Sequence, residues 1–272
     1  MGVVELSVAD LDRTLDYWQR AVGLRVIARD NGRASVGAGS ELVRFVEEPG
    51  ARPADGHTGL YHVAFLVPDR PSLARWLAHA ARDRVALEGL SDHAVSEAIY
   101  LRDPDRHGIE IYADRPRERW QGRVMELMTT LPLDVDSLFA ELADPATEPF
   151  DGLPDGTRVG HVHLRVADVP STVEFYRDVV GLDLTAQLGP MAAFLSAGGY
   201  HHHVGANTWE SLGASPGGEG IATLRHATIV LPTAEERDRV VARIAGHGQE
   251  PLERDDGVLV RDPSQNALLL AS

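Results

Sequence analysis

The sequence of 272 residues predicts an α+β protein built from four βαβββ modules, two in each half of the chain. Two observations support this fold class. The two halves repeat one another in sequence, and each half contains twice the pattern of one strand, one helix and three short strands. Self-similarity at this scale indicates that one supersecondary unit recurs along the chain. The predicted modules occupy residues 2–48, 59–112, 159–208 and 223–271.

Three pairs of segments carry the repeat between the halves. Residues 4–24 (VELSVADLDRTLDYWQRAVGL) align without gaps on residues 162–182 (VHLRVADVPSTVEFYRDVVGL), with nine of 21 positions identical. Two further pairs follow in the same order, LYHVAFLVP with LRHATIVLP and LRDPDRHGIEI with VRDPSQNALLL. We therefore expect two domains, 1–112 and 159–272. They are joined by a connector, 113–158, which is rich in Pro, Asp and Glu and has one short helix around residues 135–142.

Module 1 shows how each element is predicted. After Asp10, apolar residues recur at helical spacing up to Val22, and Gly23 is a typical residue for ending a helix. Three runs of β-type follow, and Asn31-Gly32 between the first two predicts a hairpin. The runs are 25–28, 34–36 and 42–46. The aromatic helix residues of modules 1 and 3 are interpreted as core and nothing more: Tyr17, Trp18, Phe175 and Tyr176.

Composition excludes several classes of function. A net charge of −15 argues against nucleic acid and anionic membranes as partners. The absence of cysteine excludes disulfides, zinc–thiolate sites and thiol nucleophiles. No apolar run approaches the 18 or so residues of a membrane span, and the first residues, MGVVELSVAD, lack the features of a secretion signal. We expect a cytoplasmic protein.

The openings of the modules are of the type DxxxxxxFYxxVxGL, and their endings are of the type DPxxxxxxE. With these motifs the chain resembles the vicinal oxygen chelate superfamily, which includes glyoxalase I, bleomycin-resistance proteins and extradiol ring-cleaving dioxygenases. The segments LYHVAFLVP, DHAVSEAIYLRDPDRHGIEIYADRPRERW, GHVHLRVAD and SAGGYHHHVGANTW are most similar to the CatE-type catechol 2,3-dioxygenases. The resemblance implies two glyoxalase/dioxygenase-type domains with curved mixed sheets, in which two paired modules form a cup around a metal.

The resemblance also implies a metal site of two histidines and one glutamate, taken from the first and last strands of the paired modules. Such a triad suits Fe(II) and leaves positions open for substrate and O2. In typical extradiol enzymes modules 3 and 4 supply it. Here those positions hold His161, His226 and Leu269, and leucine cannot coordinate a metal. Modules 1 and 2 are also one ligand short, because Val3 stands where the first histidine would be.

Pairing module 2 with module 3 completes the set as His62, Glu110 and His161. Modules 1 and 4 then form a cup without a metal site, and His226 becomes structural. We therefore predict that modules 2 and 3 pair, within one chain or across a dimer. His163 competes with His161, since both face the same side of a strand.

Further positions match the catalytic residues that the resemblance implies. Tyr100 stands ten residues before Glu110, His93 lies in the loop before it, and His202 aligns with the acid/base histidine of the family. Alternation along a strand would place His201 and His203 on the face opposite His202. Two other interpretations stay open: His203 is an additional metal ligand, or the three histidines are ordinary polar strand residues.

The function that follows is a metal-dependent extradiol dioxygenase acting on a catechol-like aromatic diol and O2, with Fe(II), or else Mn(II) or another divalent metal. His202 would accept a catechol proton and later return it. Tyr100 and His93 would hydrogen-bond the substrate oxygens. A glyoxalase-like isomerase and a metal-free binding protein of the bleomycin-resistance type are the alternatives. A homo-oligomer stays open.

Overall fold

The computed structural model describes residues 1–272, and it confirms the α+β class and the four βαβββ modules. Module 1 comprises β1 (Val4–Val8), α1 (Leu11–Tyr17), β2 (Arg25–Asp30), β3 (Arg33–Gly37) and β4 (Glu41–Glu47). Module 2 comprises β6 (Gly59–Leu66), α2 (Arg70–Arg82), β7 (Gly89–Asp92), β8 (Ser96–Arg102) and β9 (Gly108–Asp114). Module 3 comprises β11 (Arg158–Arg165), α5 (Val169–Glu174), β12 (Asp183–Leu188), β13 (Ala192–Ser196) and β14 (Val204–Asn207). Module 4 comprises β16 (Leu224–Val230), α6 (Ala234–Gly246), β17 (Leu252–Arg254), β18 (Gly257–Arg261) and β19 (Ala267–Ala271).

Local sequence explains the boundaries of the module 1 elements. The side chain of Asp10 accepts a hydrogen bond from the backbone N–H of Arg13 and caps α1. A π-helical turn, η1 (Trp18–Val22), continues α1, and the chain turns at Gly23 with φ at 86°. Asn31 and Gly32 both have positive φ, 38° and 75°, as the tight turn between β2 and β3 requires. In module 3 the corresponding π-helical turn is η3 (Phe175–Val180).

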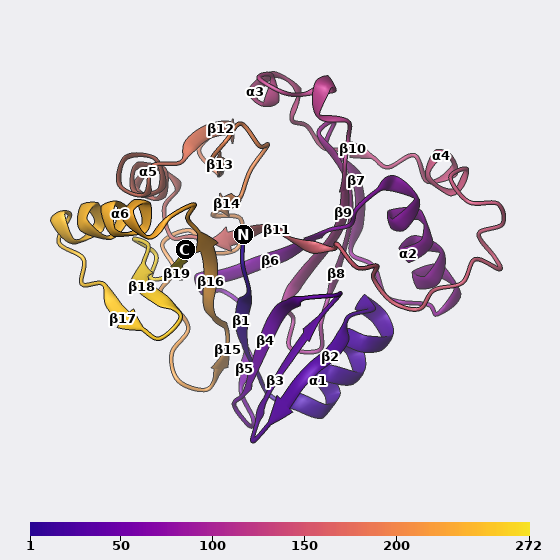
Figure 1. Cartoon of the computed structure of the whole chain (residues 1–272), viewed down its shortest axis with the longest axis horizontal. Helices are drawn as coiled ribbons and strands as arrows, with labels where there is room; N and C mark the ends of the chain where they lie inside the picture. Colours follow the sequence, from indigo (N-terminus) through magenta and orange to yellow (C-terminus); the bar gives the residue numbers. More distant parts are fainter.

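Two large sheets form the molecule, and each takes one module from each half of the chain (Figure 1). Modules 2 and 3, with the short connector strand β10 (Leu131–Pro132), form a nine-stranded sheet of order β10-β7-β8-β9-β6-β11-β14-β13-β12. Modules 1 and 4 form an eight-stranded sheet of order β17-β18-β19-β16-β1-β4-β3-β2. The joins are the antiparallel pairs β6 with β11 and β1 with β16. The predicted pairing of modules 2 and 3 is thus present within one chain.

Contacts between consecutive modules hold the two sheets together. The indole Nε1 of Trp18 in module 1 donates to Asp103 of module 2, at 3.1 Å. At the equivalent place in the second half, the hydroxyl of Tyr176 donates to Asp262, at 3.3 Å. Both aspartates are buried and belong to the repeated Asp-Pro motif. The interpretation of these aromatic residues as core alone was therefore incomplete, because each also satisfies a buried carboxylate.

The connector between modules 2 and 3 packs against the nine-stranded sheet. It contains η2 (Arg117–Arg119), α3 (Val124–Leu127), β10 (Leu131–Pro132) and α4 (Val135–Phe139), so the expected short helix is present. β10 pairs with β7 at the edge of the sheet. Two short strands, β5 (Arg52–Pro53) and β15 (Ile221–Ala222), pair separately in the loops before modules 2 and 4. The two domains expected from the sequence repeat, 1–112 and 159–272, stay a prediction.

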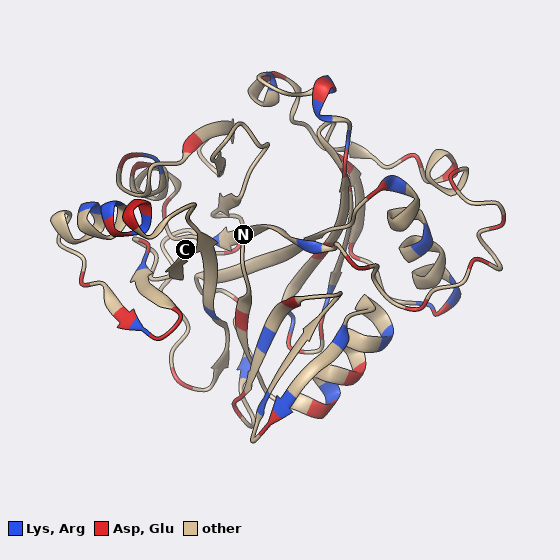
Figure 2. Cartoon of the chain, viewed as in Figure 1, with Lys and Arg blue, Asp and Glu red and all other residues tan.

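Charged side chains of both signs are interspersed on α1 and α6, whereas β6 carries none along its length (Figure 2). One hydrophobic core of 55 buried residues extends through all four modules. No helix is long and apolar enough to cross a membrane.

Candidate metal centre and catalytic pocket

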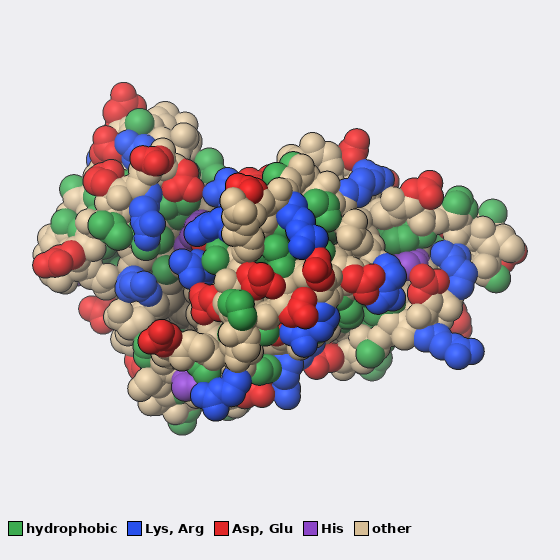
Figure 3. Space-filling view, turned by 90° about the horizontal axis from the view of Figure 1, so that it is seen from below, with side chains coloured by type: hydrophobic (Ala, Val, Ile, Leu, Met, Phe, Trp, Pro, Cys, Tyr) green, Lys and Arg blue, Asp and Glu red, His purple; other side chains and the backbone are tan.

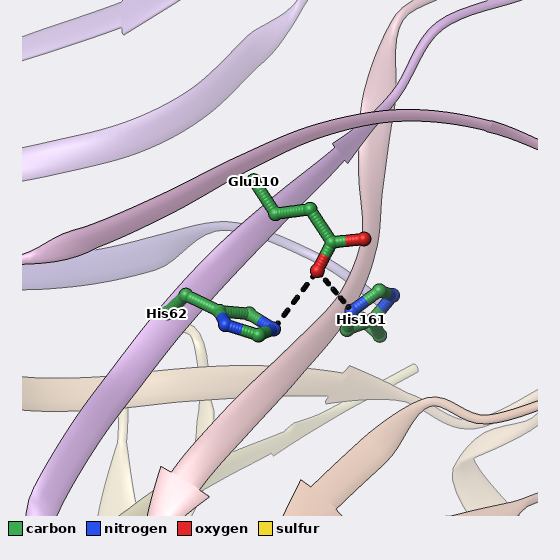
Figure 4. A group of neighbouring side chains, drawn as sticks. All are labelled: His62, Glu110 and His161. Carbon is green, nitrogen blue, oxygen red and sulfur yellow. Dashed lines mark hydrogen bonds and ion pairs between the residues drawn. The ribbon is translucent and has the colours of Figure 1, made fainter. Parts of the chain in front are cut away.

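Three neighbouring strands bring His62, Glu110 and His161 together (Figure 4). Glu110 on β9 and His161 on β11 both lie beside Ala64, which occupies the strand between them. His62 stands two residues before Ala64 and so shares its face of the sheet. The small side chain of Ala64 leaves room over the sheet, and the three longer side chains converge there.

The ligand-type atoms of these residues all lie within 4.8 Å of one another. The Nε2 atoms of His62 and His161 lie 3.0 Å and 3.2 Å from the same carboxylate oxygen, Oε2 of Glu110. The contact from His161 is a hydrogen bond. The contact from His62 lacks hydrogen-bond geometry, so its buried Nε2 has no hydrogen-bond partner.

The charges at this cluster favour a cation. Burial disfavours the ionised form of Glu110, but the neighbouring imidazoles outweigh burial and hold its pKa well below its usual range. Burial also lowers the pKa of His161 to about 4, so this ring is neutral near pH 7. No arginine lies within ion-pair distance of Glu110. A buried carboxylate needs a partner, and two nitrogens with one oxygen are suitable ligands for a divalent transition metal.

The cluster forms part of the wall of a cavity of about 450 Å³. Aromatic and apolar side chains complete the wall, among them Tyr61 of β6 itself, Phe194 of β13 and Trp209. A cavity of this size and lining suits a small aromatic molecule. The competing residue His163 also lines the cavity, packed between Tyr61 and Trp209, but only His161 belongs to the cluster with His62 and Glu110.

His93 and Tyr100 meet at the same cavity. The Nε2 atom of His93 lies 2.7 Å from the hydroxyl of Tyr100, and its Nδ1 lies 2.6 Å from the backbone oxygen of Thr129. Since a carbonyl only accepts, Nδ1 carries a proton, which leaves Nε2 as the nitrogen that can accept the Tyr100 hydroxyl. Burial, followed by the Glu110 charge, raises the pKa of Tyr100 well above its usual value, so the phenol keeps its proton.

The histidine triplet does not lie in a strand, and the expected alternation of its faces was wrong. β14 begins only at Val204, after a loop in which Gly198 and Gly199 have φ of 65° and 66°. Two successive left-handed residues turn the chain, which an extended strand does not allow. His203 turns its Nδ1 to the hydroxyl of Ser196, at 3.0 Å, and is outside the metal-ligand cluster.

His201 and His202 instead form one buried chain of hydrogen bonds with Asp114. Nε2 of His201 lies 2.9 Å from Oδ1 of Asp114, and the Nδ1 atoms of His201 and His202 are 2.8 Å apart. Because Asp114 accepts, a neutral His201 carries its proton on Nε2 and must accept at Nδ1. His202 is then the donor at Nδ1. Its Nε2, which makes no hydrogen bond within the protein, keeps a free lone pair.

His202 lines the cavity and packs against His161, with ring centroids 3.9 Å apart. Burial, together with the surrounding imidazoles, holds the pKa of His202 well below its usual value. In the protein without substrate the ring is neutral, which is the state needed to accept a proton.

Residues that sequence reasoning did not single out complete the site. Asp114 also accepts from the hydroxyl of Tyr200, at 3.1 Å, and Tyr200 lies 2.8 Å from the hydroxyl of Tyr112. Alternation along β9 would have indicated that Tyr112 and Asp114 belong to the site, because they share one face of the strand with Glu110. Thr129 lies in the connector, where no periodic signal marks it.

The family model described as the Glyoxalase/Bleomycin resistance protein/Dioxygenase superfamily matches residues 1–111 and 158–269. The chain therefore belongs to this superfamily. It is 39% identical to the catechol-2,3-dioxygenase of Bacillus subtilis (strain 168) over 277 residues, which cover 99% of this chain and 95% of that protein.

Solved structures show the same fold. Glyoxalase I from Zea mays superposes with a TM-score of 0.62 at 17% identity, covering 99% of this chain and 91% of that one. The cppA protein from Streptococcus pneumoniae TIGR4 gives a TM-score of 0.57 at 10% identity, covering 99% and 96%. At these identities the likeness concerns the fold alone.

Proposed function

We propose that the protein is an extradiol dioxygenase that cleaves a catechol-like aromatic ring with O2. The observation that carries the proposal is the buried cluster of His62, Glu110 and His161, opening into a cavity of aromatic-ring size. The identity to a catechol-2,3-dioxygenase over nearly the whole chain supports the same activity.

In this proposal His62, Glu110 and His161 hold a divalent metal, which we take to be Fe(II). The unpartnered Nε2 of His62 and the buried carboxylate of Glu110, which converge with His161, both fit a bound cation. When bound, the metal supplies Lewis acidity and a common template for the two substrate oxygens and O2.

The remaining residues bind the ring and move protons. Tyr61, Phe194 and Trp209 enclose the aromatic ring and exclude water. The Nε2 lone pair of His202 accepts a proton from a substrate hydroxyl and returns it as the ring opens. Tyr100, whose own proton is bound by His93, offers its oxygen lone pairs to the second hydroxyl. Both atoms of O2 end in the ring-opened product.

The two alternatives fit the site less well. A glyoxalase-like isomerase would use His203 as a further ligand, but Nδ1 of His203 is bonded to Ser196 and the ring lies outside the cluster. A metal-free binding protein would gain nothing from two imidazoles and a buried carboxylate whose ligand atoms all lie within 4.8 Å of one another.

The test is anaerobic reconstitution with Fe(II), followed by O2 uptake and ultraviolet–visible spectra with a panel of catechols. We expect one O2 consumed for each catechol and an absorbing ring-opened product. Glu110→Gln is the matched inactive control. A folded, iron-loaded protein that consumes no O2 with any catechol would overturn the proposal. Turnover of a methylglyoxal–thiol adduct without O2 would instead establish the isomerase.

A further inference from the structure

A second cavity, of about 600 Å³, lies in the sheet of modules 1 and 4, on the half of the molecule without a metal cluster. His226 and Leu269 line it, at the positions equivalent to His62 and Glu110. Most of its remaining wall is polar, and the wall includes the loop before module 4 with Pro216 and Gly217. On the face seen from below, blue and red side chains lie side by side (Figure 3).

Positive charge prevails in this wall, although the chain as a whole carries −15. The lining contains five arginines but only two carboxylates, Glu5 and Asp256. The arginines are Arg33, Arg44, Arg225, Arg254 and Arg261. Such a local reversal of sign attracts anions, because a concave wall concentrates the field of its charges.

Two of the arginines are already committed to carboxylates. Arg44 bonds Glu41 at 2.8 Å and reaches Asp256 at 3.2 Å. Arg225 bonds Glu5 and Glu48, each at 3.0 Å. These pairs neutralise both carboxylates of the wall and bind the edges of the cavity together.

The other three arginines keep donors available for a ligand. Arg254 and Arg261 have no carboxylate within 4.0 Å, and Arg33 has only a long contact of 3.7 Å to Glu5. Arg33 comes from β3 of module 1, whereas Arg254 and Arg261 end the strands β17 and β18 of module 4. A ligand bound by all three would bridge the two modules.

An unpaired polar atom points to the same conclusion. The Nε2 atom of His226 is buried and has no hydrogen-bond partner, while its Nδ1 lies 4.0 Å from Glu5. A buried ring nitrogen is normally satisfied. Because His226 lines this cavity, a ligand in the cavity is the available partner.

We propose that this second cavity binds a small dianion bearing carboxylate or phosphate groups. The guanidinium groups of Arg33, Arg254 and Arg261 bind its oxygens, since their planar geometry matches these groups in a bidentate way. His226 adds a hydrogen bond. The site is separate from the candidate metal centre and does not depend on the proposed function.

Isothermal titration calorimetry of the intact, metal-loaded protein tests this site. The probes are succinate and inorganic phosphate, both weak chelators, at an ionic strength held constant with chloride. We expect one site per chain for at least one probe. Arg254→Gln and Arg33→Gln should each weaken binding about tenfold or more. The control, Arg237→Gln on α6, makes the same change of charge away from the cavity and should leave binding unchanged.

Each outcome decides the proposal. Binding of succinate alone identifies a carboxylate site, and binding of phosphate alone identifies a phosphate site. No heat with either probe, or the same affinity in Arg254→Gln, Arg33→Gln and the control, overturns the proposal. Because neither Arg33 nor Arg254 is buried, the variants should keep the thermal midpoint of the parent, which checks that they are folded.

Discussion

Asp114 and His201 lie 87 residues apart in the sequence, and yet Oδ1 of the first and Nε2 of the second meet at 2.9 Å. This contact determines which nitrogen of His202 is free, because it makes His201 an acceptor towards His202. In Asp114→Asn the side-chain amide can donate as well as accept. His201 then no longer has to carry its proton on Nε2 and accept at Nδ1. We expect kcat to fall roughly 10- to 100-fold, less than the roughly 100- to 10,000-fold of a group that transfers the proton itself, because Asp114 acts through His201. KM should change little.

Tyr200→Phe is the matched control for Asp114. It removes another hydrogen bond to the same carboxylate but leaves His201 in place, so its effect on kcat should be several times smaller. Steady-state kinetics with one catechol measures both variants. A rise in KM at constant kcat for Asp114→Asn would show that the residue acts on substrate binding instead.

Glu110→Gln should lower the affinity for the divalent metal at least about a hundredfold, because a neutral amide replaces the one charged ligand. The side chain keeps its volume, so the metal-free protein should fold normally. Metal content after dialysis measures the effect. Leu269→Glu supplies a carboxylate at the equivalent place in the other sheet. A second equivalent of metal in that variant, or retention of metal by Glu110→Gln, would contradict the assignment.

Tyr100→Phe should lower kcat/KM about tenfold, the value of one neutral hydrogen bond of about 1.4 kcal/mol. Metal binding should not change, since the hydroxyl of Tyr100 is bonded to His93. The pH profile should keep its shape, because the pKa of Tyr100 is raised well above its usual value by burial and the phenol does not ionise. Loss of metal from this variant would make Tyr100 a ligand.

Asp262 should make stability depend on pH. Burial raises the pKa of Asp262 from its ordinary value of 3.8 to about 6 in the folded protein, although several hydrogen bonds to the carboxylate act in the opposite direction. The folded state therefore holds the proton more tightly. The resulting stabilisation is present below about pH 4 and is lost as the pH rises through about 6.

Asp262→Asn removes this titration. Relative to the variant, the parent should lose up to about 3 kcal/mol of unfolding free energy between about pH 4 and pH 7. Denaturant unfolding of both proteins across that range measures the difference. Parallel curves would show that Asp262 has the same pKa in the folded and unfolded chains.

The modules were predictable because each half of the sequence gives an independent prediction for the other half. Val4–Leu24 and Val162–Leu182 align without gaps, so a strand or turn expected in one copy is expected in the other. The pairing of modules 2 and 3 was predictable because these two modules together hold two histidines and a glutamate at the ligand positions. The antiparallel join of β6 and β11 confirms this pairing.

The conformation of the triplet was not predictable from alternation, because that rule holds only within a strand. Gly198-Gly199 was the signal of a turn, and it outweighs the period of two. The place of Thr129 depends on how an irregular connector packs, which no local pattern encodes. The partners of His202 also depend on contacts between residues far apart in sequence, such as His201 and Asp114.

The join of β6 with β11 also has a consequence during synthesis of the chain. His62 and Glu110 leave the ribosome with the first half, but His161 follows only after the whole connector. An unfinished chain therefore lacks one of the three proposed ligands, and it exposes the unpaired edge of β6 to other chains. The proposed ligand set becomes complete and that edge is covered at the same step, when the strand carrying His161 is added.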